Sequence, residues 1–256
     1  KIYAAKGRPD FNPLIVHVRD ADHAAEFAQI GDAAARLCGE HWPGPLTLVL
    51  SLCDNADLAP AVTAGLPTVA LRAPAHPVMQ ALLAQIDFPL AAPSANRSGF
   101  VSPTTSNHVL ETLAGRIAAV VDGGPTEKGL ESTIVAVREG GAMQLLRPGP
   151  IEIALAEPIT GDAIESPGQL ASHYAPGKPV QLNARKVAPD DFVIGFGGVA
   201  GDCTLSATGD LDEAAARLYD CLHQAAKSDK SRIAVAPIPD EGIGKAINDR
   251  LRRAAA

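Results

Sequence analysis

The sequence lacks the features of membrane, secreted and metal-binding proteins. It has no apolar run long enough to cross a bilayer and no signal-peptide pattern. The four cysteines have no short paired spacing, so we expect reduced thiols rather than disulfides or a zinc site. We therefore expect a cytoplasmic protein with no stable membrane contact and no metal held by protein side chains alone. The cysteines are Cys38, Cys53, Cys203 and Cys221.

Several common catalytic signatures are also absent. The chain contains no Gly-x-x-x-x-Gly-Lys-Ser/Thr phosphate loop, no His-Glu-x-x-His and no Gly-x-Ser-x-Gly. Its net charge of −7 argues against a large nucleic-acid-binding face but allows a small basic pocket. The length of 256 residues suits one large or two modest domains.

Short apolar runs alternate with helical periodicities, which predicts an α/β fold. The runs at 192–196 and 233–236, with helices at 211–226 and 244–253, predict a small second α/β domain with a parallel core. In the first 150 residues we expect strands at 14–18, 46–50, 68–72, 117–121, 131–137 and 143–146, and helices at 20–28, 32–42 and 76–86. A further helix is expected through 108–113, with Thr104 or Thr105 as its N-cap.

The stretch Pro89–Gly99 begins as an apolar run, read as the end of a buried central strand, and continues as a Pro/Ser/Asn/Gly loop. An ordinary strand-to-helix turn is the alternative. Other polar residues also lie near the ends of expected strands, and together they suit a polyanion such as a nucleoside triphosphate. By themselves they indicate only an α/β enzyme with an anionic ligand. The set is Lys6, Arg8, His17, Arg72, Ser94, Asn96, Ser132 and Arg147.

Six motifs in this order resemble the threonylcarbamoyl-AMP synthases, and the tail resembles their two-domain branch. The resemblance implies a twisted open mixed sheet whose helices form a basic cavity (the YrdC-like fold), with a small C-terminal Rossmann-like α/β domain. It implies a catalytic domain over 1–152, a linker or lid over 153–179 and the C-terminal domain over 180–256. The family's first strand is missing here, so we expect the natural chain to start earlier. The motifs are Lys6-Gly7-Arg8-Pro9, Asn12 to His17, Pro43 to Thr47, Arg72-x-Pro74-x-His76, Ala92 to Asn96 and Ser132 to Val135.

The resemblance implies a nucleotidyltransferase. The family condenses L-threonine, bicarbonate or CO2, and ATP with Mg2+ into threonylcarbamoyl-adenylate and pyrophosphate. A downstream tRNA threonylcarbamoyl transferase complex then modifies the adenosine next to the anticodon. Direct tRNA binding is not required of the synthase, which agrees with the acidic net charge.

Site roles follow from the same resemblance. Tyr174, in the linker, is expected to close over the site as a lid that excludes water, the alternative being a plain linker anchor. Lys6, Arg8, Ser94 and Asn96 are the expected catalytic residues. Threonine is assigned to His17, Arg72, Ala92 and Ser132, and ATP to Arg8, Asn12, Thr68, Ser94, Ser102, Arg147 and Tyr174.

Two alternatives use the same fold. A double-stranded RNA-binding module would bind with a steep dependence on salt. A carbamoyl-transfer domain of the hydrogenase-maturation type would be accompanied by zinc-finger and acylphosphatase segments, and the sequence shows neither.

Overall fold

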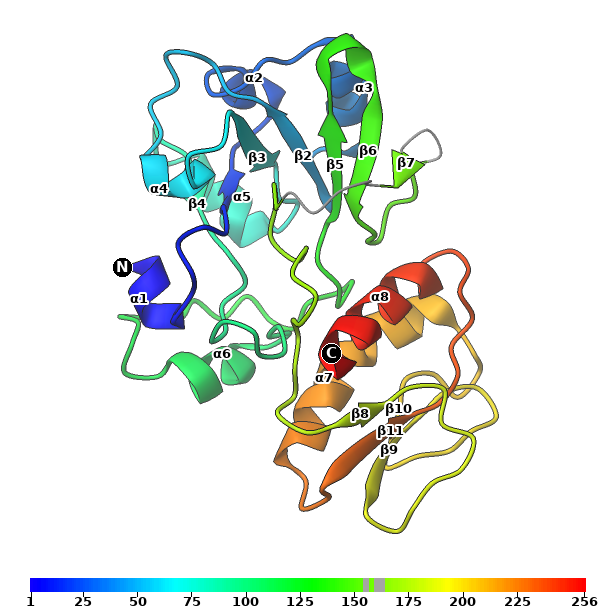
Figure 1. The fold of residues 1–256 in the computed structure, drawn as a ribbon. Coiled ribbons are helices and arrows are strands. Elements are labelled where there is room, and N and C mark those ends of the chain that lie inside the picture. Colours follow the sequence, from blue (N-terminus) through cyan, green and yellow to red (C-terminus); the bar gives the residue numbers. More distant parts are fainter. Residues whose placement is uncertain (154–156, 159–163) are drawn as a thin grey trace. The chain divides into compact units, whose positions relative to one another are not determined.

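The computed structural model describes residues 1–153, 157–158 and 164–256 (Figure 1). Contacts between Cα atoms divide the chain into two compact units. Unit 1 contains residues 1–8, 94–131 and 170–256, and unit 2 contains residues 9–93 and 132–169. Units defined by contacts need not coincide with domains, so the limits expected near residues 152 and 179 stay a prediction.

Unit 2 is built on a mixed sheet. In the described residues its seven strands have the order β4-β1-β3-β2-β5-β6-β7. Parallel and antiparallel pairs alternate across the sheet. The parallel pairs are β1 with β3, β2 with β5 and β6 with β7. The antiparallel pairs are β4 with β1, β3 with β2 and β5 with β6. The strands are β1 (Ile15–His17), β2 (Leu46–Ser51), β3 (Thr68–Arg72), β4 (Leu90–Ala91), β5 (Thr133–Val137), β6 (Met143–Arg147) and β7 (Glu157–Pro158). Its helices are α2 (Ala21–Ala25), α3 (Asp32–His41), α4 (Pro60–Thr63), α5 (Pro77–Leu83) and the 3-10 turn η1 (Glu139–Gly141).

The two faces of this sheet differ in what they pack against. Alternate residues of β3 point to opposite faces. Val69 and Leu71 join a large core cluster that includes side chains of α2 and α3. Ala70 belongs to a smaller cluster with Ile15 and Ile134. The face of this smaller cluster is therefore the one that also carries Thr68, Arg72 and His17.

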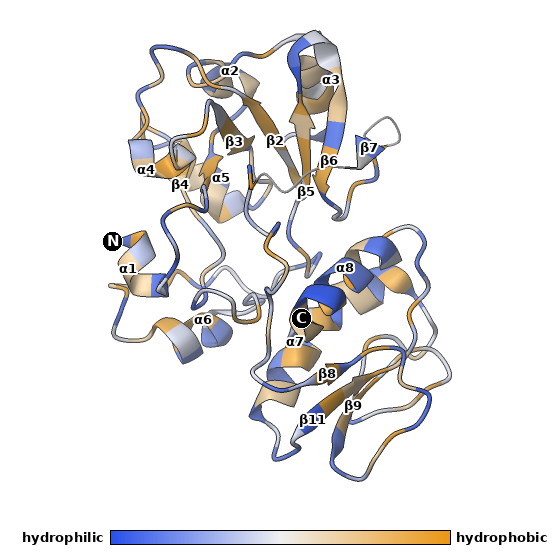
Figure 2. Cartoon of the chain, viewed as in Figure 1, coloured by the Kyte–Doolittle hydropathy of each residue, from blue (hydrophilic) through white to orange (hydrophobic). Residues whose placement is uncertain are grey.

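Unit 1 contains a second, smaller sheet. In the described chain its four strands are all parallel, in the order β10-β9-β11-β8, and they pack with α7 and α8 in one buried cluster. Figure 2 shows hydrophobic residues along β9 and β11. This confirms the parallel core expected from the alternation of strands and helices. The elements of unit 1 are α1 (Ile2–Lys6), α6 (Ser106–Leu113), β8 (Val180–Gln181), β9 (Asp191–Gly195), β10 (Cys203–Thr204), α7 (Leu211–Lys227), β11 (Arg232–Val235) and α8 (Gly244–Ala255).

Local chemistry explains where these helices begin and end. Gly7 ends α1 in the left-handed conformation at φ 61°, which glycine adopts without steric cost. The side chains of Thr105 and Asp210 accept hydrogen bonds from the backbone N–H groups of His108 and Glu213. These caps satisfy backbone donors in the first turns of α6 and α7.

Two expected strands need correction. Residues 117–121 form no strand, Val121 is 77% exposed, and no strand of the described chain pairs with this apolar run. The strand expected to be central, at 89–92, is the two-residue edge strand β4, which pairs only with β1 in the described sheet. Pro89 and Pro93 flank it and lack the N–H that a central strand must donate.

The expectation of reduced cysteines is wrong for two of them. Cys203 of β10 and Cys221 of α7 form a disulfide, and both are buried. Their sequence separation of 18 is too long for sequence spacing to indicate a pair. Cys38 and Cys53 are free thiols. Among the described residues, no helix is long and apolar enough to cross a membrane.

Candidate functional site

Four of the predicted residues lie at one end of the sheet of unit 2. β1 and β3 run in parallel, and their last residues, His17 and Arg72, are opposite one another. β2 starts at this end, because it is antiparallel to β3, and β5 starts beside β2. Ser132 immediately precedes β5, and Arg147 ends β6 opposite Ile134. The structure therefore brings His17, Arg72, Ser132 and Arg147 to one end of this sheet.

The buried guanidinium of Arg147 orients Ser132. Its Nε and Nη2 donate to the Ser132 carbonyl oxygen at 3.1 and 3.0 Å, and Nη2 also donates to Ser132 Oγ at 3.1 Å. Ser132 Oγ lies 2.7 Å from Thr47 Oγ1. Nη1 of Arg147 donates to the Pro167 carbonyl at 3.4 Å. Arg147 thus fixes the Ser132 hydroxyl and adds a positive charge here.

Arg72 is the residue best placed to bind an anion. Its Nε donates to the Gly44 carbonyl at 3.1 Å, and this bond fixes the guanidinium. Burial, and then the charge of Arg147, lowers the pKa of Arg72 to about 10, so it stays charged at neutral pH. In the described chain no hydrogen bond uses its two terminal nitrogens, and no carboxylate contributes to its pKa. Two adjacent cations with a free guanidinium edge suit a carboxylate or a phosphate.

His17 is uncharged at neutral pH. Burial, and then the charge of Arg72, lowers the pKa of His17 to about 4. Its Nδ1 is buried and has no hydrogen-bond partner among the described residues. A neutral imidazole nitrogen in this state can accept a hydrogen bond from a bound ligand.

The other predicted site residues of unit 2 are Thr68, Ala92 and Asn12, and they take different positions relative to the sheet. Thr68 shares the face of Arg72 and lies four residues before it on β3, about 13 Å away along the strand. Ala92 donates its backbone N–H to the Ile15 carbonyl, next to β4. Asn12 is buried just before β1.

In unit 1, Lys6 binds the loop at 94–96. Its ammonium donates to the carbonyl oxygens of Ser94, at 2.5 Å, and Asn96, and lies 3.5 Å from Asn96 Oδ1. Burial, and then the charge of Arg8, lowers the pKa of Lys6 to about 8, so the ammonium form predominates at pH 7. Lys6 therefore fixes the loop that carries Ser94.

Asn96 supports the same loop from within. Its Nδ2 donates to the carbonyls of Arg97 and Phe100 at 3.0 and 2.8 Å, and the residue is buried. Arg8 is also buried, and burial lowers its pKa while Tyr3 opposes the shift. The structure thus brings together Lys6, Ser94 and Asn96, with Arg8 two residues beyond Lys6.

Ser102 and Tyr174 belong to the core of unit 1. Ser102 Oγ donates to Glu131 Oε1 at 2.6 Å. Tyr174 is 1% exposed, and its ring lies 5.6 Å from that of Tyr219, with the Arg250 guanidinium 5.6 Å from its centroid. Tyr174 is packed as an anchor in this conformation, and its lid role stays a prediction.

Comparisons with known proteins show which family the chain belongs to. A family model described as "Telomere recombination" matches residues 1–149, and one described as "Threonylcarbamoyl-AMP synthase, C-terminal domain" matches residues 146–256. The threonylcarbamoyl-AMP synthase of Bacillus subtilis strain 168 is 39% identical, covering 100% of this chain and 82% of that protein. The Pyrococcus abyssi enzyme of the same name is 33% identical, and the match covers 100% of this chain and 83% of that protein. The chain belongs to the threonylcarbamoyl-AMP synthase family.

The fold of this family member agrees with a solved relative. The crystal structure of P. abyssi Sua5 complexed with L-threonine is 32% identical and superposes with a TM-score of 0.89, covering 99% of this chain and 83% of that one. E. coli YciO, at 18% identity and a TM-score of 0.51, is similar in fold alone. The predicted mixed α/β, YrdC-like fold with a C-terminal domain is confirmed.

The sequence motifs of the synthase family did not identify every residue that organises these clusters. Thr47 lies in the Pro43 to Thr47 motif, but the resemblance assigns it no role. Glu131, Tyr219 and Arg250 were not singled out, although Glu131 directly precedes Ser132. Tyr219 and Arg250 come from helices distant in the sequence, so no local spacing could connect them with Glu131.

A metal site made only of protein ligands does not fit the described residues. They contain no group of three or more His, Cys, Asp or Glu side chains that could hold an ion. Mg2+ with a nucleotide is usually bound through phosphate oxygens and few protein groups. The half-buried Ser94 hydroxyl, on the loop fixed by Lys6, fits that limited role.

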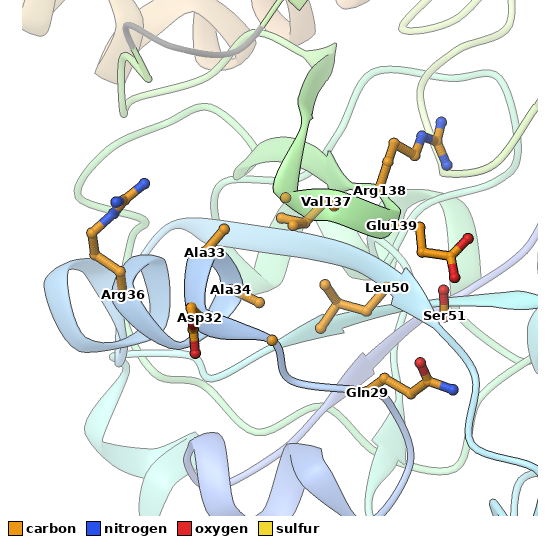
Figure 3. A pocket seen from close by; sticks show the side chains of 13 residues that line it. Gln29, Asp32, Ala33, Ala34, Arg36, Leu50, Ser51, Val137, Arg138 and Glu139 are labelled. Atoms are coloured by element: carbon orange, nitrogen blue, oxygen red, sulfur yellow. The ribbon is translucent and has the colours of Figure 1, made fainter.

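Unit 2 also has a cavity at the end of β2 that lies opposite to the end where His17, Arg72, Ser132 and Arg147 gather. It has a volume of about 630 Å3 and lies between the start of α3, the end of β2 and the turn at η1 (Figure 3). Gln29, Ser51 and Glu139 line it, whereas none of the predicted site residues does. The synthase family assignment therefore does not depend on this cavity.

Proposed function

We propose that this chain forms threonylcarbamoyl-AMP and pyrophosphate from L-threonine, bicarbonate or CO2, and ATP. The observation that carries this proposal is the Arg72 guanidinium, fixed by Gly44 and set beside Arg147, Ser132 and the neutral His17. An amino acid offers a carboxylate to such a cation and an N–H donor to such an imidazole. The P. abyssi relative was crystallised as a complex with L-threonine, which supports threonine as the amino acid here.

We assign threonine to the residues at this end of the sheet. The Arg72 guanidinium binds the carboxylate, and His17 Nδ1 accepts a hydrogen bond from the amino group. The Ser132 hydroxyl, oriented by Arg147 and Thr47, contacts the threonine side chain. Ala92 lines the same place with its backbone.

The reaction then has two bond-forming steps. The threonine nitrogen attacks CO2, loses a proton and becomes a carbamate. A carbamate oxygen attacks the α-phosphorus of ATP, the bond to the β-phosphate oxygen breaks, and pyrophosphate leaves. Negative charge moves onto phosphate oxygens, and fixed cations that stabilise it are worth roughly a hundred- to a thousandfold in rate each. This adenylyl transfer defines a nucleotidyltransferase.

We assign the triphosphate to the basic and hydroxylated residues that the resemblance identified. Lys6 fixes the 94–96 loop so that the Ser94 hydroxyl is held toward the nucleotide. Mg2+ bound with ATP would supply further charge neutralisation, and the Ser94 hydroxyl would be available to help hold it. The remaining assigned residues are Arg8, Asn12, Thr68, Asn96, Ser102, Arg147 and Tyr174.

The product is a small molecule, so we place the chain upstream of a tRNA threonylcarbamoyl transferase in the cytoplasm, with no need to bind tRNA itself. The test measures pyrophosphate release from ATP with and without threonine and bicarbonate. We expect release only when both are present, with no dependence on RNA. Equal release without threonine would contradict the proposal, and salt-sensitive RNA binding without any release would favour an RNA-binding module.

A further inference from the structure

A half-buried carboxylate, that of Glu131, determines the hydrogen-bonding state of Ser102. Ser102 Oγ lies 2.6 Å from Glu131 Oε1. Glu131 also forms an ion pair with Arg250, whose Nε lies 3.0 Å from Glu131 Oε2, so it is an ionised carboxylate. An ionised carboxylate can only accept hydrogen bonds, so the hydroxyl proton of Ser102 must point to Glu131.

Two residues of the C-terminal helices hold this carboxylate in place. The Tyr219 hydroxyl lies 3.0 and 2.8 Å from Glu131 Oε1 and Oε2. Arg250 is fully buried, and its Nη1 also pairs with Asp249 at 2.9 Å. Burial, and then the negative charge of Glu131, raises the pKa of Tyr219 well above its usual value, so the phenol keeps its proton as a donor. Both carboxylate oxygens are therefore bonded from fixed directions.

The backbone of Ser102 is fixed as well. His223 Nε2 lies 3.1 Å from the Ser102 carbonyl oxygen, which can only accept, so Nε2 carries the proton. Burial, and then the charge of His108, lowers the pKa of His223 to about 4, so this ring is neutral at pH 7. Ser102 can thus neither rotate its hydroxyl proton away from Glu131 nor easily shift its main chain.

We propose that Glu131 is a positioning residue that makes Ser102 a hydrogen-bond acceptor toward the nucleotide. A serine hydroxyl has one proton and two lone pairs, and here the proton is already used. Ser102 then recognises an N–H or O–H donor of the nucleoside: the adenine amino group or a ribose hydroxyl. An ionised phosphate oxygen offers no proton, so it does not match. This inference rests on the proposed function, and it gives α7 and α8 a part in nucleotide recognition.

The test compares four nucleotides with the full chain: ATP, ITP, which lacks the adenine amino group, 2′-deoxy-ATP and 3′-deoxy-ATP. Calorimetric binding and the KM and kcat of threonine-dependent pyrophosphate release are measured for each. For the unmodified chain we expect one analogue to bind roughly tenfold or more weakly than ATP, which identifies the donor. Ser102→Ala should remove this discrimination.

Glu131→Gln is the decisive variant. Its amide can present an N–H to Ser102 and turn the hydroxyl proton outward, so we expect a raised KM for ATP, unchanged kcat and loss of the discrimination. Tyr219→Phe keeps the bond from Ser102 to Glu131, so it should lower stability but keep the discrimination. Asp191→Asn is the matched control: it removes another carboxylate paired with an arginine, the buried Asp191, which lies 2.9 Å from Arg232 and forms no hydrogen bond with Ser102.

Three results would overturn the inference: equal binding of all four nucleotides by the unmodified chain, unchanged discrimination in Glu131→Gln, or the same loss in Asp191→Asn. If Glu131→Gln does not fold, Ser102→Ala with the four nucleotides still decides whether Ser102 meets a donor. Absence of threonine-dependent pyrophosphate release would contradict the proposed function instead, and the calorimetric arm would still test this inference.

Discussion

The disulfide between Cys203 and Cys221 gives a quantitative prediction about stability. It joins β10 to α7 across a sequence separation of 18 residues, inside the core of the C-terminal sheet. In the chain-entropy description, a cross-link of that length removes about 11 cal/mol/K from the unfolded chain, or about 3 kcal/mol at 25 °C. For a chain of this size, that corresponds to a decrease of roughly 6–12 °C in Tm when the cross-link is lost.

The assay combines thiol counting with thermal unfolding. Under denaturing, non-reducing conditions we expect two titratable thiols, from Cys38 and Cys53, and four after reduction. The double variant Cys203→Ala, Cys221→Ala should unfold at the lower temperature, and reductant should not lower it further. The matched control, Cys53→Ala, removes a free thiol and should keep the Tm and its response to reductant.

The reasoning is refuted by four titratable thiols before reduction, or by a double variant as stable as the original chain. The first result would restore the expectation of reduced cysteines drawn from the sequence. The second would mean that the unfolded chain gains no entropy when this loop is opened.

Three further predictions concern the site and its support. Arg72→Ala should raise the KM for threonine roughly 10- to 150-fold, which corresponds to the free energy of a hydrogen bond to a charged group. The KM for ATP should change much less. A larger rise in the KM for ATP than in that for threonine, measured by steady-state kinetics, would show that the assignment is inverted. Gly149→Ala should destabilise the chain and lower activity, because a Cβ there would lie 2.4 Å from the Thr133 backbone nitrogen; an unchanged urea midpoint would contradict this. Since burial lowers the pKa of His17 and His223 to about 4, the unfolded chain binds more protons than the native chain between about pH 4 and 6.5. Stability should therefore rise with pH across this window, and His223→Asn should reduce the slope in urea unfolding measured at several pH values.

The sequence by itself determined the fold class and most of the elements. Alternation and capping are local properties, so the N-cap Asp210, the C-cap Gly7 and the β5–β6 hairpin could be read from neighbouring residues. For α6 the sequence left Thr104 and Thr105 as possible caps, and the structure shows that Thr105 is the cap. The motifs were also sufficient to indicate the family, because each is a short run with a fixed order along the chain.

Only the tertiary structure decided which polar groups meet and which strands are central. The run at 117–121 is apolar enough for a strand, but no strand of the described residues pairs with it, and β4 lies at the edge of the described sheet between two prolines. Ser132 is fixed by Arg147 and Ser102 by Glu131, and Glu131 is in turn held by helices about 90 and 120 residues further along. A hydrogen bond depends on distance in space, and sequence spacing carries no information about partners that far apart.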